Sequence, residues 1–219
     1  MRLYLASTSP ARLALLRSAG IEPVTVAPDV DEDAVAAAAA ATQGAALIPS
    51  ALVGLLARAK AEAVYRELTA VGRDQGLVLG GDSVFVIDGV TYGKPHTPEK
   101  AWERWQLQRG RTGQLYSGHW LIEHDPAVEA GAGAALAVGA VAVADVTFAD
   151  DISDAELDAY IATGEPLAVA GAFTIDSLGA PFITHVSGDP STVVGLSLPT
   201  LRRLVRELGH EWPSLWNRV

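Results

Sequence analysis

The chain has 219 residues, of which 49% are hydrophobic and 19% charged, and its formal net charge is −10 at pH 7. A chain of this length forms one large domain or two small ones, and it buries enough apolar surface to fold without a disulfide or a structural metal. The absence of cysteine excludes a disulfide scaffold, a zinc finger and a thiol nucleophile. The acidic balance argues against non-specific binding to nucleic acid and to anionic membranes.

The N-terminus and one uncharged stretch decide where we expect the protein to reside. The apolar stretch after Met1 is too short for the core of a secretion signal. Residues 34–57 carry no charge and are long enough to span a bilayer, but alanine dominates them and polar residues interrupt them. We therefore expect a soluble, cytoplasmic protein that binds neither a membrane nor nucleic acid.

The chain opens with a predicted strand at residues 3–6, a tight turn and a helix. Ser9 suits the N-cap of that helix, and Pro10 suits its first position. Ser7, Ser9 and Arg12 gather at the helix N-terminus, where unpaired N–H groups and the helix dipole attract anions. The turn therefore predicts an anion site; the alternative is that Ser9 only caps the helix and Arg12 is solvated.

Helices and strands are interleaved along the rest of the chain. The expected helices are residues 51–68, 98–108, 153–161 and 198–208, and the expected strands are residues 21–26, 76–80, 83–87, 90–92, 114–123, 138–148 and 181–186. Asp88-Gly89 predicts a hairpin turn. Residues 34–46 are either a low-complexity helix or a mobile insertion, and residues 188–195 are expected to form a loop. This order predicts an α/β domain built on a mixed sheet.

Two groups of carboxylates are candidates for chemistry. Asp82 follows Gly80-Gly81, so we expect it at the end of a strand, where catalytic carboxylates are common; the local sequence favours an Asx turn instead. Residues 29–33 are expected to form an acidic loop that contains the triplet Asp31-Glu32-Asp33. Paired carboxylates can hold Mg²⁺, although most such triplets are only solvated.

Basic and imidazole side chains give weaker signals. Lys60 lies on a predicted helix and Lys94 lies just past the predicted hairpin, and each is an ordinary solvated lysine unless it points into a cleft. The five histidines lack zinc-like spacing, and His119 and His124 are expected at the surface. The sequence contains no Walker-type phosphate loop, no dinucleotide-binding fingerprint and no nucleophile elbow.

The sequence contains a series of short motifs, which in chain order are Leu5-Ala6-Ser7-Thr8-Ser9-Pro10-Ala11-Arg12, Asp31-Glu32, Leu56-Ala57 with Lys60-Ala61, Gly81-Asp82-Ser83-Val84, Gly93-Lys94-Pro95, Gly110-Arg111 with Ser117-Gly118, Ala170-Gly171-Ala172-Phe173, and Gly188-Asp189 through Gly195-Leu196. In this order, the motifs resemble the signatures of the Maf family of nucleotide pyrophosphatases. The resemblance implies a Maf/ITPase-like α/β fold, with a mixed, elongated, twisted sheet flanked by helices and a central cleft. It further implies a single domain of two lobes over residues 1–219, in which residues 34–54 and 125–137 are insertions.

Five positions depart from the family pattern. Ala11 stands in place of the first of two arginines, Ser83 in place of threonine and Gly113 where histidine is usual. Asp176 stands where the family often has glutamine, near the presumed base pocket, and Ser197 replaces a proline. These departures leave the implied reaction class intact and the base preference open.

The resemblance implies a hydrolase that cleaves nucleoside triphosphates, canonical or modified, between the α and β phosphates to give a monophosphate and pyrophosphate. The implied catalytic residues are Asp82, Lys94, Lys60 and Arg12, and the implied substrate-binding residues are Ser7, Ser9, Arg12, Lys60, Lys94, Arg111 and Asp176. Glu32 and Asp82 would hold Mg²⁺ or Mn²⁺, and Asp82 is either the general base or a metal ligand. The family also suggests a house-cleaning role, a homodimer and, as an alternative function, a nucleotide-binding regulator of septum formation with little catalysis.

Overall fold

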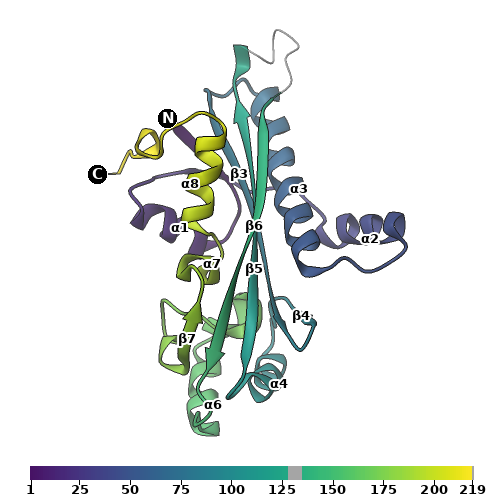
Figure 1. Ribbon diagram of the computed structural model, residues 1–219, viewed down its shortest axis with the longest axis vertical. Helices are drawn as coiled ribbons and strands as arrows, with labels where there is room; N and C mark the ends of the chain where they lie inside the picture. Colours follow the sequence, from purple (N-terminus) through teal and green to yellow (C-terminus); the bar gives the residue numbers. More distant parts are fainter. Residues whose placement is uncertain (128–134, 219) are drawn as a thin grey trace. The chain divides into compact units, whose positions relative to one another are not determined.

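A computed structural model describes residues 1–127 and 135–218 of the chain. Its strands are β1 (Arg2–Ala6), β2 (Val24–Val26), β3 (Gly76–Ile87), β4 (Val90–Tyr92), β5 (Thr112–His124), β6 (Ala137–Phe148) and β7 (Ile183–Ser187). Its helices are α1 (Pro10–Ser18), α2 (Glu32–Gln43), α3 (Pro49–Ala70), α4 (Pro98–Gln108), α6 (Asp154–Ala162), α7 (Pro190–Val194) and α8 (Leu198–Glu207) (Figure 1).

The strands of the described residues form one seven-stranded sheet in the order β2-β1-β3-β5-β6-β7, with β4 paired to β3. β1 pairs in parallel with β2 and β3, whereas β3 with β4 and β6 with β7 are antiparallel. The predicted hairpin at Asp88-Gly89 is confirmed, because Ile87 faces Val90 in the β3–β4 register. The structure therefore confirms the predicted mixed α/β architecture.

The chain is organised as two compact units, each made of segments that are distant in sequence. The first unit contains Met1–Asp82, Gly118–Ala142 and Leu198–Val219, and the second contains Ser83–Ser117 and Val143–Ser197. The long strand β3 passes from the first unit to the second directly after Asp82.

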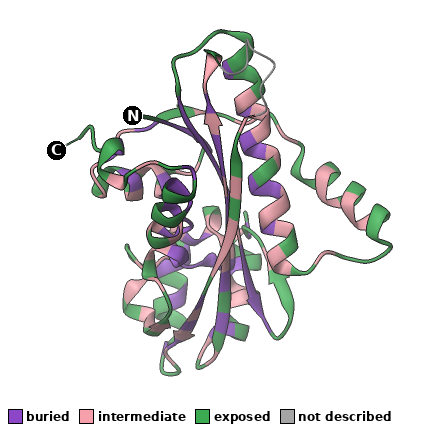
Figure 2. Cartoon of the chain, turned by 45° about the horizontal axis from the view of Figure 1, so that its top comes forward, coloured by how far each residue is buried: buried purple, intermediate pink, exposed green. Residues whose placement is uncertain are grey.

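In the first unit, α3 packs its apolar face against the sheet. Ala61, Val64 and Leu68 of α3 contact Tyr4 of β1 and Val78 of β3 in one buried cluster. Figure 2 shows buried residues following one face of α3. Burying an aliphatic side chain of this size stabilises the fold by about 1.5–3 kcal/mol. The cluster thereby fixes the face of α3 that is turned toward β3.

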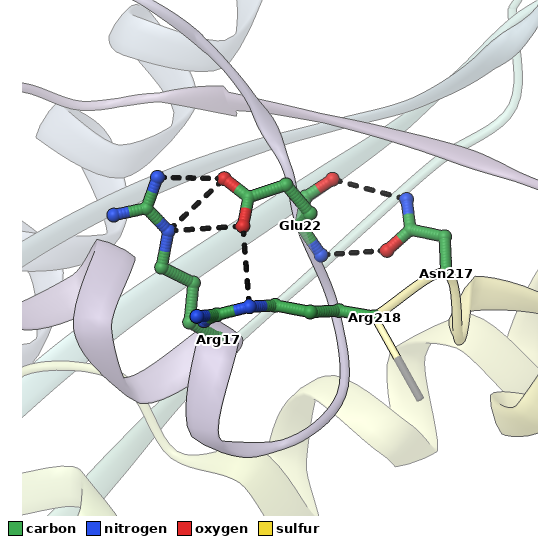
Figure 3. A network of polar contacts seen from close by, with 4 residues as sticks. All are labelled: Arg17, Glu22, Asn217 and Arg218. Atoms are coloured by element: carbon green, nitrogen blue, oxygen red, sulfur yellow. Dashed lines mark hydrogen bonds and ion pairs between the residues drawn. The ribbon is translucent and has the colours of Figure 1, made fainter.

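The C-terminal tail is tied to the segment that follows α1 in the same unit. The Glu22 carboxylate accepts a hydrogen bond from Arg17 Nη2 at 2.7 Å and lies 3.6 Å from Arg218 Nε. The Asn217 side chain accepts from the Glu22 backbone N–H at 2.6 Å and donates to the Glu22 carbonyl at 3.0 Å (Figure 3). These contacts join residues nearly 200 positions apart in sequence and hold the C-terminal tail against the segment that follows α1.

Edge-to-face aromatic contacts form the core of the second unit. The Phe148 ring lies 5.3 Å from Trp105 and 5.0 Å from Phe173, and Phe85 lies 5.2 Å from Phe173, measured between ring centroids. The Trp105 indole also donates a hydrogen bond to the Ala172 carbonyl at 2.8 Å. Aromatic pairs of this geometry add about 0.5–1.5 kcal/mol each beyond their burial. The core therefore anchors α4 to the segment around Ala172.

Five predicted elements need correction. The strand expected at residues 21–26 is only β2, and the two strands expected at residues 76–80 and 83–87 are a single strand, β3. Asp82 consequently lies inside a strand, so neither the strand-end position nor the Asx turn is correct. The expected acidic loop at residues 29–33 is confirmed only up to Asp31, because Glu32 and Asp33 lie in the first turn of α2. The expected loop at residues 188–195 contains α7, which Asp189 caps.

The ambiguity at residues 34–46 is resolved as a helix, because α2 continues to Gln43 and Gly44 ends it in the left-handed conformation. The uncharged residues 34–57 are thus divided between α2 and α3. Among the described residues, no helix combines the length and the hydropathy that a membrane-spanning segment requires. Part of the expected insertion at residues 125–137, namely residues 128–134, lies outside the described residues. That both stretches are insertions stays a prediction.

The expectation that His119 and His124 lie at the surface is wrong. Both lie on β5, where His119 is 1% exposed and His124 is 0% exposed. The His124 ring lies edge-on to Tyr4 and Tyr65, with centroids 6.3 and 5.8 Å away. Its Nε2 atom is 3.2 Å from the Arg73 carbonyl, so a polar partner accompanies the burial of the imidazole. Both histidines therefore belong to the interior of the first unit.

Candidate active site

The turn between β1 and α1 is organised by two serine hydroxyls. Ser9 caps α1 by accepting a hydrogen bond from the Arg12 backbone N–H at 3.4 Å. The Ser7 hydroxyl accepts from the Ser9 N–H at 3.1 Å and from Arg12 Nη1 at 3.2 Å. The turn therefore holds both the helix N-terminus and a guanidinium group in place, which is the composition of an anion site.

Arg12 is 9% exposed, so the alternative that it is solvated is wrong. Burial lowers the pKa of its guanidinium, and the charges of Asp82 and Glu32 act in the opposite direction. Gly81 makes room for this side chain, because a Cβ atom there would lie 3.2 Å from Arg12 Nε. A guanidinium offers several donors in a fixed plane, which match the oxygens of a phosphate group.

Two glycines let α3 approach the sheet closely enough to place Lys60 beside Asp82. A Cβ atom on Gly80 would lie 2.1 Å from the Ala57 carbonyl of α3, and one on Gly118 would lie 2.2 Å from the Val53 carbonyl. With the two backbones in contact, Lys60 Nζ donates to Asp82 Oδ1 at 2.7 Å. The spacing of helix and strand therefore sets the geometry of this ion pair.

Glu32 joins the same ion pair from the first turn of α2. Asp31 caps this helix by accepting from the Ala34 N–H at 2.9 Å, and Glu32 Oε1 lies 2.8 Å from Lys60 Nζ. The Glu32 side chain is 50% exposed, whereas the side chains of Lys60 and Asp82 are 9% and 11% exposed. Glu32 is therefore the solvent-facing member of the cluster.

The pKa of the Asp82 carboxyl is raised above its usual value. Burial is the largest cause, and the charge of Glu32 adds to it. The neighbouring Lys60 and Arg12 lower the same pKa but do not cancel the effect of burial. A carboxylate of raised pKa is a better proton acceptor, as a general base requires.

The donor set suits a divalent cation that shares its coordination with a substrate. Within residues 1–127 and 135–218, no group of three or more His, Cys, Asp or Glu side chains could hold a metal ion. Two carboxylates, from Glu32 and Asp82, nevertheless converge on one atom, Lys60 Nζ. Mg²⁺ is commonly bound by one or two carboxylates together with waters and substrate phosphates. The two residues fit this mode of binding.

The structure thus brings together six of the predicted site residues in the first unit: Ser7, Ser9, Arg12, Glu32, Lys60 and Asp82. Lys94, Arg111 and Asp176 belong to the second unit.

Lys94 is exposed, in a loop whose backbone is fixed on both sides. The Gly93 carbonyl accepts from the Gly171 N–H at 3.3 Å, and the His96 N–H donates to the Leu167 carbonyl at 3.1 Å. These two hydrogen bonds therefore fix the backbone on either side of an exposed, positively charged side chain.

Arg111 pairs with Asp88 in the β3–β4 turn and donates to the Leu107 carbonyl at 3.3 Å. Asp176 is exposed on the loop formed by residues 174–179. Within the part of the chain that the structure describes, Lys94, Arg111 and Asp176 make no hydrogen bond or ion pair with one another. Arg111 is thus already engaged in holding the hairpin, whereas Asp176 faces solvent.

Glu165 is a supporting residue that no sequence motif singles out. Its carboxylate accepts hydrogen bonds from the Tyr160 hydroxyl, the Ser177 hydroxyl at 2.7 Å, the Thr174 hydroxyl and the backbone N–H groups of Leu178 and Gly179. These donors flank Asp176 on both sides, so Glu165 holds the loop that presents it. No sequence spacing marks such a contact, since the loop reaches Glu165 only through the fold.

The departure at Gly113 has a packing explanation. A Cβ atom at this position would lie 2.1 Å from Phe85 Cζ, so the Phe85 ring occupies the space of any larger side chain. Ser83 is likewise accommodated, since its hydroxyl pairs with that of Ser117 at 2.9 Å. Nothing in the structure explains Ala11.

Comparison with known proteins identifies the family. The model of the family described as "Maf-like protein" matches residues 2–208. The chain is 67% identical to the nucleoside triphosphate pyrophosphatase of Leifsonia xyli, over 100% of this chain and 98% of that protein. It is 48% identical to the protein of the same name from Salinispora tropica, over 100% and 88% of the two chains, and 43% identical to that from Corynebacterium diphtheriae, over 99% of both. The chain belongs to the Maf family.

Proposed function

We propose that the protein is a nucleoside triphosphate pyrophosphatase, which hydrolyses the α–β phosphoanhydride of canonical or modified nucleotides to a nucleoside monophosphate and pyrophosphate. The observation that carries the proposal is the cluster of Arg12, Lys60, Asp82 and Glu32 beside the capped N-terminus of α1. The names of the relatives support the same reaction.

The cationic part of the cluster would bind the triphosphate. The N-terminal N–H groups of α1, the Arg12 guanidinium and the Lys60 ammonium would stabilise the charge that develops on the phosphate oxygens. Ser7 and Ser9 would hold this arrangement or donate to the substrate. We further propose that Lys94 and Arg111 add positive charge and that Asp176 contacts the base.

The acidic part of the cluster would activate water. Asp82 would accept the proton of the attacking water, for which its raised pKa suits it, or would place that water as a metal ligand. A divalent cation, Mg²⁺ or Mn²⁺, would be held by Glu32 and Asp82 and would supply Lewis acidity and a water of lowered pKa. Losing one such catalytic group typically slows a reaction by about 10²–10⁴-fold.

The reaction is tested by product analysis with a panel of canonical and modified nucleoside triphosphates, each with Mg²⁺ or Mn²⁺. We expect equal amounts of monophosphate and pyrophosphate, and the panel then also reveals the preferred base. Release of orthophosphate and a diphosphate would contradict the proposal. Tight nucleotide binding with no product under any metal would favour the alternative, a nucleotide-binding regulator.

A further inference from the structure

We propose that the Lys60 ammonium occupies, in the substrate-free protein, the position between Glu32 and Asp82 that a divalent cation takes when substrate binds. On this view Lys60 is an internal counter-ion that leaves the two carboxylates for the phosphate groups of the substrate. The identity of that substrate rests on the proposed function, but the competition between lysine and cation concerns the protein alone.

The geometry places three groups at one point. Lys60 Nζ lies 2.7 Å from Asp82 Oδ1 and 2.8 Å from Glu32 Oε1. The two oxygens come from separate elements, the interior of β3 and the first turn of α2, so their convergence is a product of the fold. Carboxylate oxygens are the ligands that hard divalent cations prefer. The ammonium therefore sits where the available protein ligands for such a cation meet.

The charges of the cluster are balanced without any ligand. Arg12 and Lys60 carry two positive charges, and Glu32 and Asp82 carry two negative charges. A divalent cation that approached the same oxygens would be repelled by the Lys60 ammonium and would have to displace it from both partners. The free protein should therefore bind such a cation weakly.

A triphosphate changes this balance because it offers Lys60 a new anionic partner. Once the ammonium pairs with phosphate oxygens, both carboxylates are left for the cation. Each ligand then raises the affinity for the other by the same factor, as linkage requires. Substrate and cation are thereby expected to enter the site together.

The exchange needs only side-chain rotation. Lysine carries a compact charge on a flexible stem, and its three donors are not bound to one plane, so it can change partners without losing geometry. Glu32 is 50% exposed and free to adjust its rotamer, while the packing of α3 on Gly80 holds the backbone near Asp82. The helix and the strand can therefore keep their positions while the ammonium moves.

The test is a titration of the nucleotide-free, full-length chain with Mn²⁺ at mildly alkaline pH, followed by electron paramagnetic resonance. We expect Lys60→Met and Lys60→Gln to bind Mn²⁺ at least tenfold more tightly than the wild type. Lys100→Met is the matched control, because it removes the same charge from an exposed site on α4 and should bind Mn²⁺ like the wild type. Lys60→Arg keeps the charge and should show no gain.

A second substitution locates the cation. Adding Asp82→Asn to Lys60→Met should abolish the gain in Mn²⁺ affinity, because it removes one of the two carboxylates. Equal or weaker Mn²⁺ binding by folded Lys60→Met or Lys60→Gln would overturn the proposal, and so would a gain that survives Asp82→Asn. No nucleotide is present, so this result is read separately from the assay of pyrophosphate release.

Discussion

Asp82 is the residue at which burial and charge oppose each other most directly. Its carboxylate lies 2.7 Å from a lysine, yet burial still raises its pKa. Keeping a charged carboxylate there at neutral pH therefore costs stability that a neutral side chain would not cost. At this position we therefore expect the charged carboxylate to lower the stability of the fold and to raise the reactivity of the site.

The raised pKa of Asp82 predicts a pH-dependent effect of Asp82→Asn on stability. Because the pKa is raised on folding, the stabilising contribution of the protonated carboxyl is complete below the unfolded value of about 3.9 and is lost as pH rises through the folded pKa. The melting temperature of Asp82→Asn relative to the wild type should therefore increase between about pH 4 and neutrality. Thermal unfolding at a series of pH values measures this difference in melting temperature. The control is Asp158→Asn, because Asp158 is exposed. A difference that stays constant with pH would count against burial as the dominant cause.

For single residues, the sequence predicts which side chains form the site better than it predicts how deeply they are buried. The motif order selected Arg12, Lys60 and Asp82, and the structure brings all three together. The sequence could not show that Arg12 is buried or that the histidines of β5 are interior, because burial depends on elements that approach only in the folded chain. It also gave no sign of Glu165, whose donors lie on a loop brought near by the fold.

At the scale of elements, the contact between α3 and β3 determines the site. The sequence places Gly80 at the end of an expected strand, two residues before Asp82. Its function is to let a helix backbone lie against a strand, and that role depends on the tertiary neighbour rather than on local conformation.

Gly80→Ala should therefore damage both stability and catalysis. The new Cβ would meet the Ala57 carbonyl, so α3 must shift and carry Lys60 away from Asp82. We expect a loss of roughly 1–3 kcal/mol of unfolding free energy, as for other overpacked cores, together with reduced kcat. Urea unfolding and the pyrophosphate assay measure the two effects.

Gly54→Ala on the same helix is the matched control. A Cβ there would lie 3.7 Å from Val141 Cγ2, an ordinary contact, and alanine favours the helix by about 1 kcal/mol. It should be neutral or stabilising. Equal behaviour of the two variants would show that the close approach at Gly80 is not required.

The loop at residues 174–179 gives a second prediction for an element. Burial alone would raise the pKa of Glu165, but hydrogen bonds from Thr174 and Ser177 outweigh it, so the pKa is lowered. Glu165→Ala should accelerate amide hydrogen exchange at Leu178 and Gly179, whose N–H groups bond to this carboxylate. Exposed Glu103→Ala is the control and should leave these two amides unchanged.

The same loop should respond to acid. Because the pKa of Glu165 is lowered on folding, its ionised carboxylate stabilises the folded loop at pH values above the unfolded pKa of about 4.3. This stabilisation is lost as pH falls through the folded pKa. In the wild type, protection at Leu178 and Gly179 should therefore decline under acidic conditions, once intrinsic exchange is corrected for pH. Protection that is independent of both pH and Glu165 would contradict this role of the carboxylate.

At the scale of the whole molecule, the sequence predicts the fold class and most of the elements. Alternating helices and strands indicated a mixed sheet, and the hairpin at Asp88-Gly89 followed from local turn chemistry. The order of strands and the division into two units could not be predicted from local pattern, because both depend on pairings between distant segments. The homodimer stays a prediction, which a sizing column tests.

The central claim is that Lys60 and Asp82 act as one unit in releasing pyrophosphate. The most direct measurement is a double-mutant cycle on kcat with Lys60→Met, Asp82→Asn and the double variant, under saturating nucleotide and metal. We predict that each single variant loses about 10²–10⁴-fold and that the double variant loses little more than the worse single one, because groups that act together are not additive. Losses that multiply in the double variant, or full activity in either single variant, would contradict the account.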